Sequence, residues 1–180
     1  EEGKVLSVVA SFQNTKNDEL LKLVKTIIKS EQYAINPAGE WTMGGFDADT
    51  GLSGRKLIID NYGPQISIGG GSFSGKDATK VDRSAAYMAR FVAKNLVSAG
   101  YGKEVFVSVA YAIGMALPLM IEARNEKGED LAKIVKNNFD FRPLAIIERL
   151  KLREPIFSRT ATGGHFGKDD FSWEKIEKMK

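Results

Sequence analysis

Two hydrophobic periods alternate along the first part of this chain, one typical of strands and one typical of helices. Residues 5–12 (VLSVVASF) are short and rich in β-branched side chains, which predicts a strand. Asn17 or Asp18 can then cap a helix that carries lysines along one face. The opposite face carries apolar residues three and four positions apart, namely Leu20, Leu21, Val24, Ile27 and Ile28. This pattern predicts a surface helix whose apolar stripe lies on a sheet.

Four short segments further along the chain predict more strands. Residues 55–60 (RKLIID) and 65–68 flank a turn at 62–64 that contains glycine and proline. Residues 105–113 (VFVSVAYAI) are apolar at almost every position, which predicts a strand buried on both faces or nearly so. Residues 118–123 follow after a loop and are the expected antiparallel partner of that strand.

Three later segments have the helical period. They span 79–99, 129–139 and 142–150, the last beginning at an Arg-Pro pair. The first is rich in small residues that would let it press closely on a neighbouring element: Ala85, Ala86, Ala89 and Ala93. Paired strands with separate helices predict an α+β fold, with mixed or antiparallel sheet layers and helices packed on one face.

Composition narrows the class of protein. With 43% hydrophobic residues and 26 basic against 23 acidic side chains, the net charge is only +3, and no basic stripe of the kind that binds nucleic acid is visible. The chain has no cysteine and no apolar run near the about 20 residues of a membrane helix. We therefore expect a cytoplasmic protein that binds neither nucleic acid nor membrane. The sequence starts without methionine or signal peptide, in what resembles mid-strand, which predicts a fragment or a processed chain.

The most informative stretch is residues 69–77 (GGGSFSGKD), called the glycine loop below. Glycines at this density bring no side chains to a core, but they let backbone N–H groups approach a ligand. Lys76 after the last glycine, and a helix opening just beyond, favour an anionic ligand such as phosphate. Residues 70–76 fit G-x-x-x-x-G-K, but Asp77 stands where a P-loop needs the hydroxyl of Ser or Thr for magnesium. A P-loop hydrolase is therefore disfavoured, and a flexible hairpin with an exposed lysine weighs about equally with a phosphate site of another design.

Charged residues around the glycine loop favour the phosphate site. Lys76 and Lys80 are four apart and would face one ligand together once the helix begins. Asp82 offers a carboxylate to a hard cation beside the same phosphates, and Arg55 can grip phosphate bidentately. Lys56 would point to the opposite face of the strand predicted there. Each charge alone fits solvated surface, but the set has the composition of a polyphosphate–metal site.

Three other residues have both a structural and a functional interpretation. Asp49, in a loop bounded by glycine, is either a turn residue or a partner for a substrate ammonium group. Trp41 is either part of a core or an aromatic that stacks on a base. His165, between glycines and without a paired acid in the sequence, fits a structural role better than a catalytic one.

At this point several motifs together resemble one family. They are GGGSFSGKDATKVDRSAAY (69–87), GLSGRKLIID (51–60), YAIG (111–114), NFDFRP (138–143), GHFG (164–167) and FSWEK (171–175). All resemble the C-terminal part of S-adenosylmethionine synthetase (methionine adenosyltransferase). The resemblance runs from about Asn36 to the end and is looser before it, and the block at 69–87 is by far the most specific.

The resemblance implies an enzyme of three similar α+β domains that joins methionine to ATP and hydrolyses the released triphosphate to phosphate and pyrophosphate. Residues 1–45 would end the central domain, and 46–180 would form the C-terminal domain. Mg²⁺ and K⁺ are the implied cofactors, and ATP and L-methionine the substrates. The implied assembly is a homodimer or homotetramer with active sites between subunits, or a pair with a complementary N-terminal chain.

The resemblance also implies roles for individual residues. For catalysis these are Arg55, Lys76 and Lys80, and for methionine binding Asp49 and Lys80. Asp82 matches a magnesium carboxylate. Implied ATP contacts, among them the adenine-stacking aromatic (Trp41) and a residue near the adenine (Ile113), are Glu40, Trp41, Asp49, Arg55, Lys56, Ser72, Lys76 and Ile113.

Departures from the family pattern keep a second interpretation open. Glu40 replaces a usual arginine, Ile68 a usual histidine and Ser72 a common alanine. The family's N-terminal part, with its GHPDK-type segment, catalytic histidine, further metal carboxylates and potassium site, is absent from these 180 residues. We therefore expect half a site and no activity from this chain alone. The alternative is a non-catalytic nucleotide-binding or partner module of the same ancestry.

Overall fold

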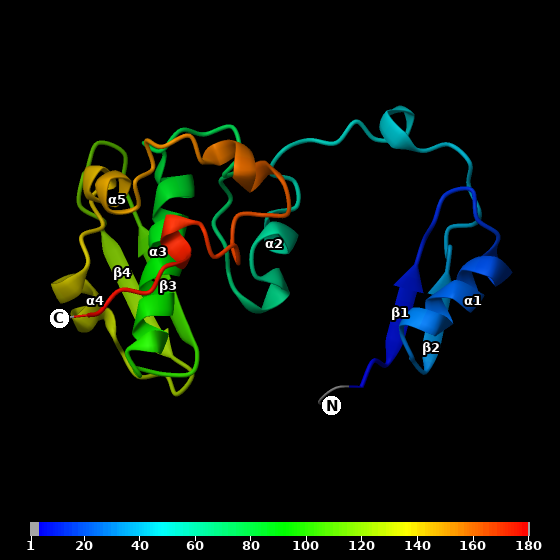
Figure 1. Ribbon diagram of the computed structural model, residues 1–180, viewed down its shortest axis with the longest axis horizontal. Coiled ribbons are helices and arrows are strands. Elements are labelled where there is room, and N and C mark those ends of the chain that lie inside the picture. The colour runs from blue at the N-terminus through cyan, green and yellow to red at the C-terminus, as the bar shows by residue number, and fades with distance from the viewer. Residues whose placement is uncertain (1–3, 180) are drawn as a thin grey trace. The chain divides into compact units, whose positions relative to one another are not determined.

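A computed structural model describes residues 4–179 and divides the chain into two compact units, one up to Leu52 and one from Ser53. In the first unit, β1 (Ser7–Ala10) and β2 (Gln32–Ile35) pair in parallel and are connected by α1 (Asn17–Ile27) (Figure 1). The strand and the helix predicted from the sequence are confirmed. The domain boundary predicted at residues 45/46 stays a prediction.

The apolar stripe of α1 is only partly buried. Leu20 and Val24 are covered, whereas Ile27 is 71% exposed, and Val9 on β1 is 69% exposed. The predicted cap is wrong: Lys16 is the N-cap residue, without a side-chain cap bond. Two short strands and one helix offer too little surface to cover this unit's apolar side chains.

The second unit consists of one long helix, one hairpin and several short helical segments. Its elements are α2 (Leu57–Asp60), α3 (Val81–Ser98), β3 (Val105–Ala110), β4 (Met120–Asn125), α4 (Ala132–Asn138) and α5 (Pro143–Arg149). β3 and β4 are antiparallel, with Val105 opposite Asn125 and Ala110 opposite Met120. The α+β fold and the predicted hairpin are confirmed. Among residues 4–179, no helix is both long and apolar enough to cross a membrane.

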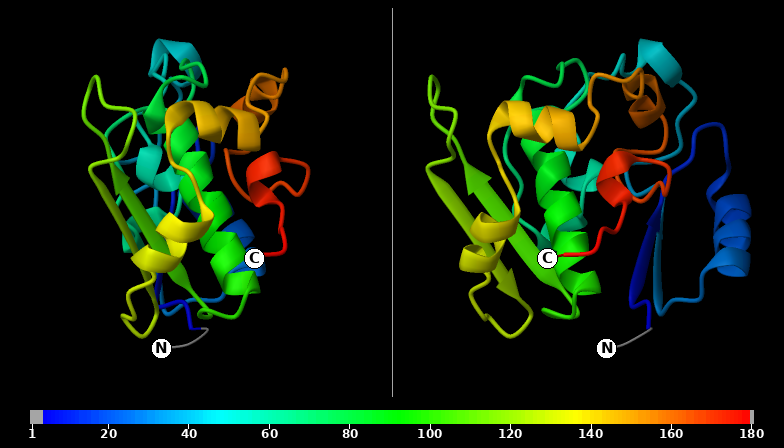
Figure 2. Two further views of the ribbon diagram at one scale, coloured as in Figure 1. Left: turned by 90° about the vertical axis from the view of Figure 1, so that its left-hand side faces the viewer. Right: turned by 60° about the vertical axis from the view of Figure 1, so that its left-hand side comes forward.

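The helix α3 lies between the β3–β4 hairpin and the C-terminal segment (Figure 2). Large apolar side chains recur at helical spacing on its buried face. Aromatic residues from the C-terminal segment complete the core. The largest fully buried members of this core include Tyr87, Met88, Phe91, Val92, Leu96, Phe141, Phe171 and Trp173. Asp82, near the start of α3, therefore belongs to a helix whose buried face contributes many of the core side chains.

The strands predicted at 55–60 and 65–68 are wrong. Residues 57–60 form one turn of helix, and the short 3₁₀ turn Gly63–Gln65 precedes an irregular segment. A strand without a partner leaves its backbone groups unpaired, whereas this turn closes local bonds, from Asp60 N–H to the Lys56 carbonyl at 2.9 Å for example. Because no strand forms, the two strand faces expected for Arg55 and Lys56 do not exist.

A buried carboxylate fastens the C-terminal segment to α3. The Glu174 side chain is 1% exposed and accepts bonds from Arg90 Nη2 at 3.0 Å, Lys94 Nζ at 2.8 Å and Gly167 N–H at 2.7 Å. Burial alone would raise the pKa of Glu174, but the bonds from Arg90 and Lys94 outweigh it and hold the pKa below its ordinary value.

We expect Glu174→Gln to lower the free energy of unfolding by about 3 kcal/mol, because it leaves two cations without a counter-charge. Chemical denaturation measures this change. Glu177→Gln is the matched control, since Glu177 pairs with Arg149 at an exposed position where a pair contributes at most about 1 kcal/mol. Equal midpoints for the two variants would contradict the anchoring role.

Candidate functional site

The glycine loop leads into α3 and is held at its centre by one buried aromatic side chain. Phe73 is 9% exposed and meets the Tyr87 ring edge-on, with centroids 5.9 Å apart. Around it, Gly69, Gly70 and Gly75 are exposed, and Gly75 has φ of +85°, a left-handed conformation that favours glycine. The loop is thus fixed at Phe73 and open to solvent on both sides of it.

Lys76 and Asp82 form the central charge pair of the site. Lys76 Nζ lies 3.0 Å from Asp82 Oδ2, and the lysine side chain is 28% exposed against 51% for the aspartate. Gly71 makes this placement possible, because a Cβ on that glycine would lie 2.2 Å from the Asp82 Cγ. The sequence predicted that both residues belong to one polyphosphate–metal site, and in the structure their charged groups are in contact.

Lys80 does not share a helical face with Lys76, because α3 begins only at Val81. Lys80 is the N-cap residue, and its Nζ lies 3.1 Å from the Thr79 hydroxyl and 3.7 Å from Asp77 Oδ2. Asp77 accepts bonds from the Thr79 hydroxyl and backbone N–H, which hold its pKa below the ordinary value. The residue that breaks the P-loop pattern therefore orders the turn that precedes α3.

The backbone next to Arg55 lies close to the glycine loop, because the neighbouring residue Gly54 contacts Ser72. A Cβ on Gly54 would lie 2.5 Å from the Ser72 Cβ, so the two backbones are in close contact. Arg55 and Lys56 are exposed, and within residues 4–179 Arg55 has no ion pair. Ser72 donates a bond to the Ser74 carbonyl at 3.2 Å, so its hydroxyl serves the loop itself.

The remaining predicted site residues are Ile113 in the second unit and Glu40, Trp41 and Asp49 in the first unit. Ile113 is fully exposed in the turn between β3 and β4. In the first unit, the Glu40 carboxylate binds Asn17 N–H and Lys16 Nζ, both at 2.9 Å, and so caps the positive end of α1. The bond to Lys16 holds the pKa of Glu40 below its ordinary value. Asp49 accepts a bond from Gly51 N–H at 2.8 Å, and Trp41 is 37% exposed.

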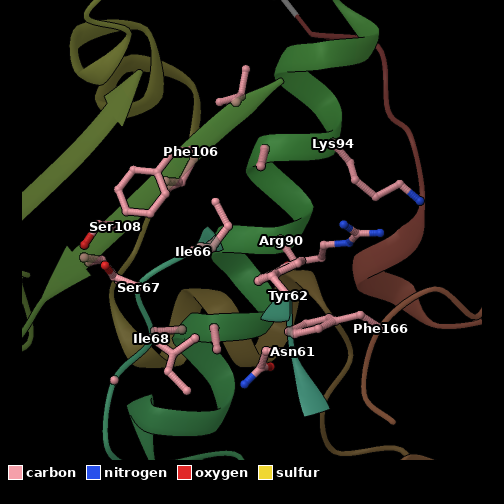
Figure 3. Close-up of a pocket in the computed structure, with 18 of the residues that line it drawn as sticks. Asn61, Tyr62, Ile66, Ser67, Ile68, Arg90, Lys94, Phe106, Ser108 and Phe166 are labelled. Atoms are coloured by element: carbon pink, nitrogen blue, oxygen red, sulfur yellow. The ribbon is translucent and has the colours of Figure 1, made fainter. Parts of the chain in front are cut away.

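A groove that the sequence did not predict runs from the glycine loop along α3 (Figure 3). It encloses about 1070 Å³ between α3, the open edge of β3 and residues 61–71. Its walls are mostly apolar, with Ile66 and Phe106 facing each other across it and Arg90 on the α3 side. The predicted close approach of this alanine face holds for part of it: Ala85 is buried, Ala86 packs against the core, and α3 contacts β3. The same four small side chains also line the groove, where they leave it open: Ala85, Ala86, Ala89 and Ala93. Their spacing was the sequence signal for this surface.

His165 is buried, at 7% exposure, and bonds to side chains of α3 and the glycine loop. Burial first, and then the positive charge of Arg83, hold its pKa below the ordinary value, with Lys168 adding to the effect and Asp60 opposing it. The structural interpretation of this histidine agrees with its burial in the core.

We expect the lowered pKa of His165 to make the protein less stable in mild acid. As the pH falls through the ordinary histidine pKa of about 6.5, the unfolded chain binds a proton that the folded chain does not, so stability present above that pH is lost. Unfolding free energies at pH 7.5 and 5.5 should fall more steeply for the wild type than for His165→Gln. Parallel slopes for the two proteins would contradict this assignment.

The residues present fit only part of a metal site. Among residues 4–179, no three His, Asp or Glu side chains gather closely enough to hold a metal ion. Asp82 offers one carboxylate beside the glycine loop, and Mg²⁺ commonly takes one or two carboxylates and completes its shell with water and substrate phosphate. Asp82 therefore fits a magnesium ion that arrives with a polyphosphate, and no closed cage of ligands from residues 4–179 surrounds it.

Comparisons with known proteins identify the family that this chain resembles. The family described as "S-adenosylmethionine synthetase, C-terminal domain" matches residues 43–175. S-adenosylmethionine synthase from Borreliella burgdorferi is 43% identical over 197 residues, covering 98% of this chain and 50% of that protein. The enzyme of the same name from Mesoplasma florum is 52% identical over 198 residues, covering 98% and 52%.

One solved structure is similar in fold to this chain. The structure described as an unusual S-adenosylmethionine synthetase from Campylobacter jejuni superimposes with a TM-score of 0.81 at 34% identity. The match covers 97% of this chain and 52% of that one. The chain spans about half the length of the curated relatives it matches.

Proposed function

We propose a function on the basis of the family to which the chain belongs. This chain is a member of the S-adenosylmethionine synthetase family. From that premise, the chain supplies the C-terminal part of an active site that forms S-adenosylmethionine from ATP and L-methionine, with release of phosphate and pyrophosphate. The observation that carries the proposal is the Lys76–Asp82 pair on an open glycine loop, with the segment of Arg55 packed against that loop.

The proposed reaction suits this set of residues. The thioether of methionine has no proton to lose, so its attack on the ribose C5′ of ATP needs no general base. It needs alignment of sulfur and carbon, and stabilisation of the charge on the departing triphosphate. Lys76, Lys80 and Arg55 supply positive charge for that purpose, and Asp49 and Lys80 are the proposed methionine contacts. Asp82 would hold Mg²⁺, which neutralises phosphate charge when bound, and K⁺ is the second proposed cofactor.

The proposal includes a partner. The first unit exposes large apolar side chains, such as Val9, Phe12 and Ile27. Their exposure is an argument for a further protein surface that covers them in the assembled protein. We propose a homodimer or homotetramer with active sites between subunits, or a complex with a complementary N-terminal chain. The proposed location is the cytoplasm.

Calorimetric titration of the chain with magnesium tripolyphosphate tests the polyphosphate site without the rest of the enzyme. We expect saturable binding that weakens with salt, because cations on an exposed loop carry it. The absence of saturable heat at millimolar concentrations would contradict the proposal. Glu40 favours the alternative of a non-catalytic partner module, since its carboxylate is already engaged at α1. Binding without turnover in the completed enzyme would identify that alternative.

A further inference from the structure

A buried arginine lies directly beneath the glycine loop. Arg83 is 3% exposed, and three of its N–H groups are used: Nη1 donates to the Lys76 carbonyl at 2.7 Å, Nε to Tyr87 Oη at 3.0 Å and Nη2 to Thr160 Oγ1 at 2.8 Å. Its guanidinium also lies 3.6 Å from the centre of the Phe157 ring. Within residues 4–179 no carboxylate forms an ion pair with Arg83.

The donors of Arg83 fix the direction of a chain of hydrogen bonds. Arginine only donates, so Tyr87 Oη accepts from it and turns its own O–H toward His165 Nδ1, 2.7 Å away. His165 then carries its proton on Nε2, which faces the Ser74 hydroxyl at 3.4 Å. The chain therefore starts at α3 and ends on the glycine loop, two residues before Lys76.

The two ends of this network hold the same short piece of loop. Arg83 binds the carbonyl of Lys76, and His165 contacts the side chain of Ser74, while Phe73 packs on both rings of the network, at 5.9 Å from Tyr87 and 5.1 Å from His165. Tyr87 in turn stacks on Trp173 with centroids 3.9 Å apart, which ties the network to the core. Three residues of this segment, Phe73, Ser74 and Lys76, are thus each in contact with the network.

We propose that Arg83, Tyr87 and His165 are positioning residues that clamp residues 73–76 so that the Lys76 ammonium group is presented to a bound polyphosphate. The inference rests on the proposed function. Among residues 4–179 the partners of the buried guanidinium are a carbonyl, two hydroxyl groups and the Phe157 ring, and none of them carries a negative charge. An anion bound above the loop would supply that missing counter-charge. A single oxygen atom, Tyr87 Oη, connects the cation to the histidine, so its removal divides the clamp.

Tyr87→Phe is the decisive variant, because it removes that oxygen and keeps the ring stacked on Trp173. The matched control is Tyr111→Phe, which removes a hydroxyl bonded to the Phe141 carbonyl at 2.7 Å, outside the clamp. Arg83→Lys keeps the positive charge but loses the planar set of guanidinium N–H donors, and it replaces Tyr87→Phe as the test variant if that variant does not fold. Amide hydrogen exchange of the peptide covering residues 72–80, followed by mass spectrometry, reports the order of the loop without any ligand.

We expect Tyr87→Phe to speed exchange of this peptide about tenfold, the effect of losing about one hydrogen bond, and Tyr111→Phe to leave it unchanged. Calorimetry with magnesium tripolyphosphate should show affinity about tenfold weaker for Tyr87→Phe only. In the completed enzyme kcat should fall with KM for methionine unchanged. Equal loop exchange in all variants would overturn the clamp. A wild type that never binds tripolyphosphate but shows the exchange effect would overturn the proposed function and leave the clamp in place.

Discussion

Lys76→Ala is expected to lower the turnover of the completed enzyme by about a hundred- to a thousandfold. Its ammonium group is the only cation of the glycine loop, and its side chain is 28% exposed at the point where the departing triphosphate would carry charge. A group that stabilises developing charge in a preorganised site typically accounts for this much of the rate. Steady-state kinetics with saturating ATP and methionine measure the effect.

The control for this change is Lys133→Ala, which removes an exposed lysine from α4, an element outside the candidate site. We expect this control to keep the wild-type rate. A folded Lys76→Ala enzyme with wild-type turnover would remove Lys76 from the catalytic machinery. Unfolding curves of both variants should coincide with that of the wild type, because surface substitutions ordinarily change stability by less than about 0.5 kcal/mol.

The second large effect concerns the chain by itself. We expect the 180-residue chain to form no S-adenosylmethionine above background, because it spans about half the length of its relatives and, on the proposed function, would supply only one wall of the site. Alignment of two substrates requires groups on both sides of them. Incubation with ATP, methionine, Mg²⁺ and K⁺, followed by chromatography of the products, measures this activity.

Addition of the N-terminal half of a full-length relative is the matching positive experiment. We expect turnover to appear only in the mixture, and to be lost again when the mixture contains Lys76→Ala. Saturable turnover by the chain alone would contradict the half-site account. A mixture that associates but stays inactive would favour the non-catalytic alternative.

Local patterns predicted the fold where an element's partner is nearby in sequence. The β3–β4 hairpin and α3 follow directly from apolar runs and helical spacing, because their stabilising contacts form within a short stretch. Residues 55–60 have the same strand-like composition, yet they form a turn of helix. A strand is decided by the neighbour it pairs with, and no pattern in this segment reports which neighbour is present.

The candidate site was predicted in composition and only partly in geometry. Lys76 and Asp82 were joined by their types and spacing, whereas their contact depends on the missing side chain of Gly71. Arg83 lies inside the most specific motif but carried no role, because arginine is rarely buried without an acidic partner. His165 and Arg83 are 82 residues apart, and only the folded chain brings both to Tyr87.

The proposed function requires that the glycine loop binds the polyphosphate of ATP. Amide NMR spectra of the isotopically labelled chain, recorded during titration with magnesium tripolyphosphate, test it residue by residue. We predict saturable shifts concentrated in residues 69–82, with the Lys76→Ala chain showing none of them. Shifts spread evenly over exposed lysines, or confined to residues outside 53–82, would contradict the claim.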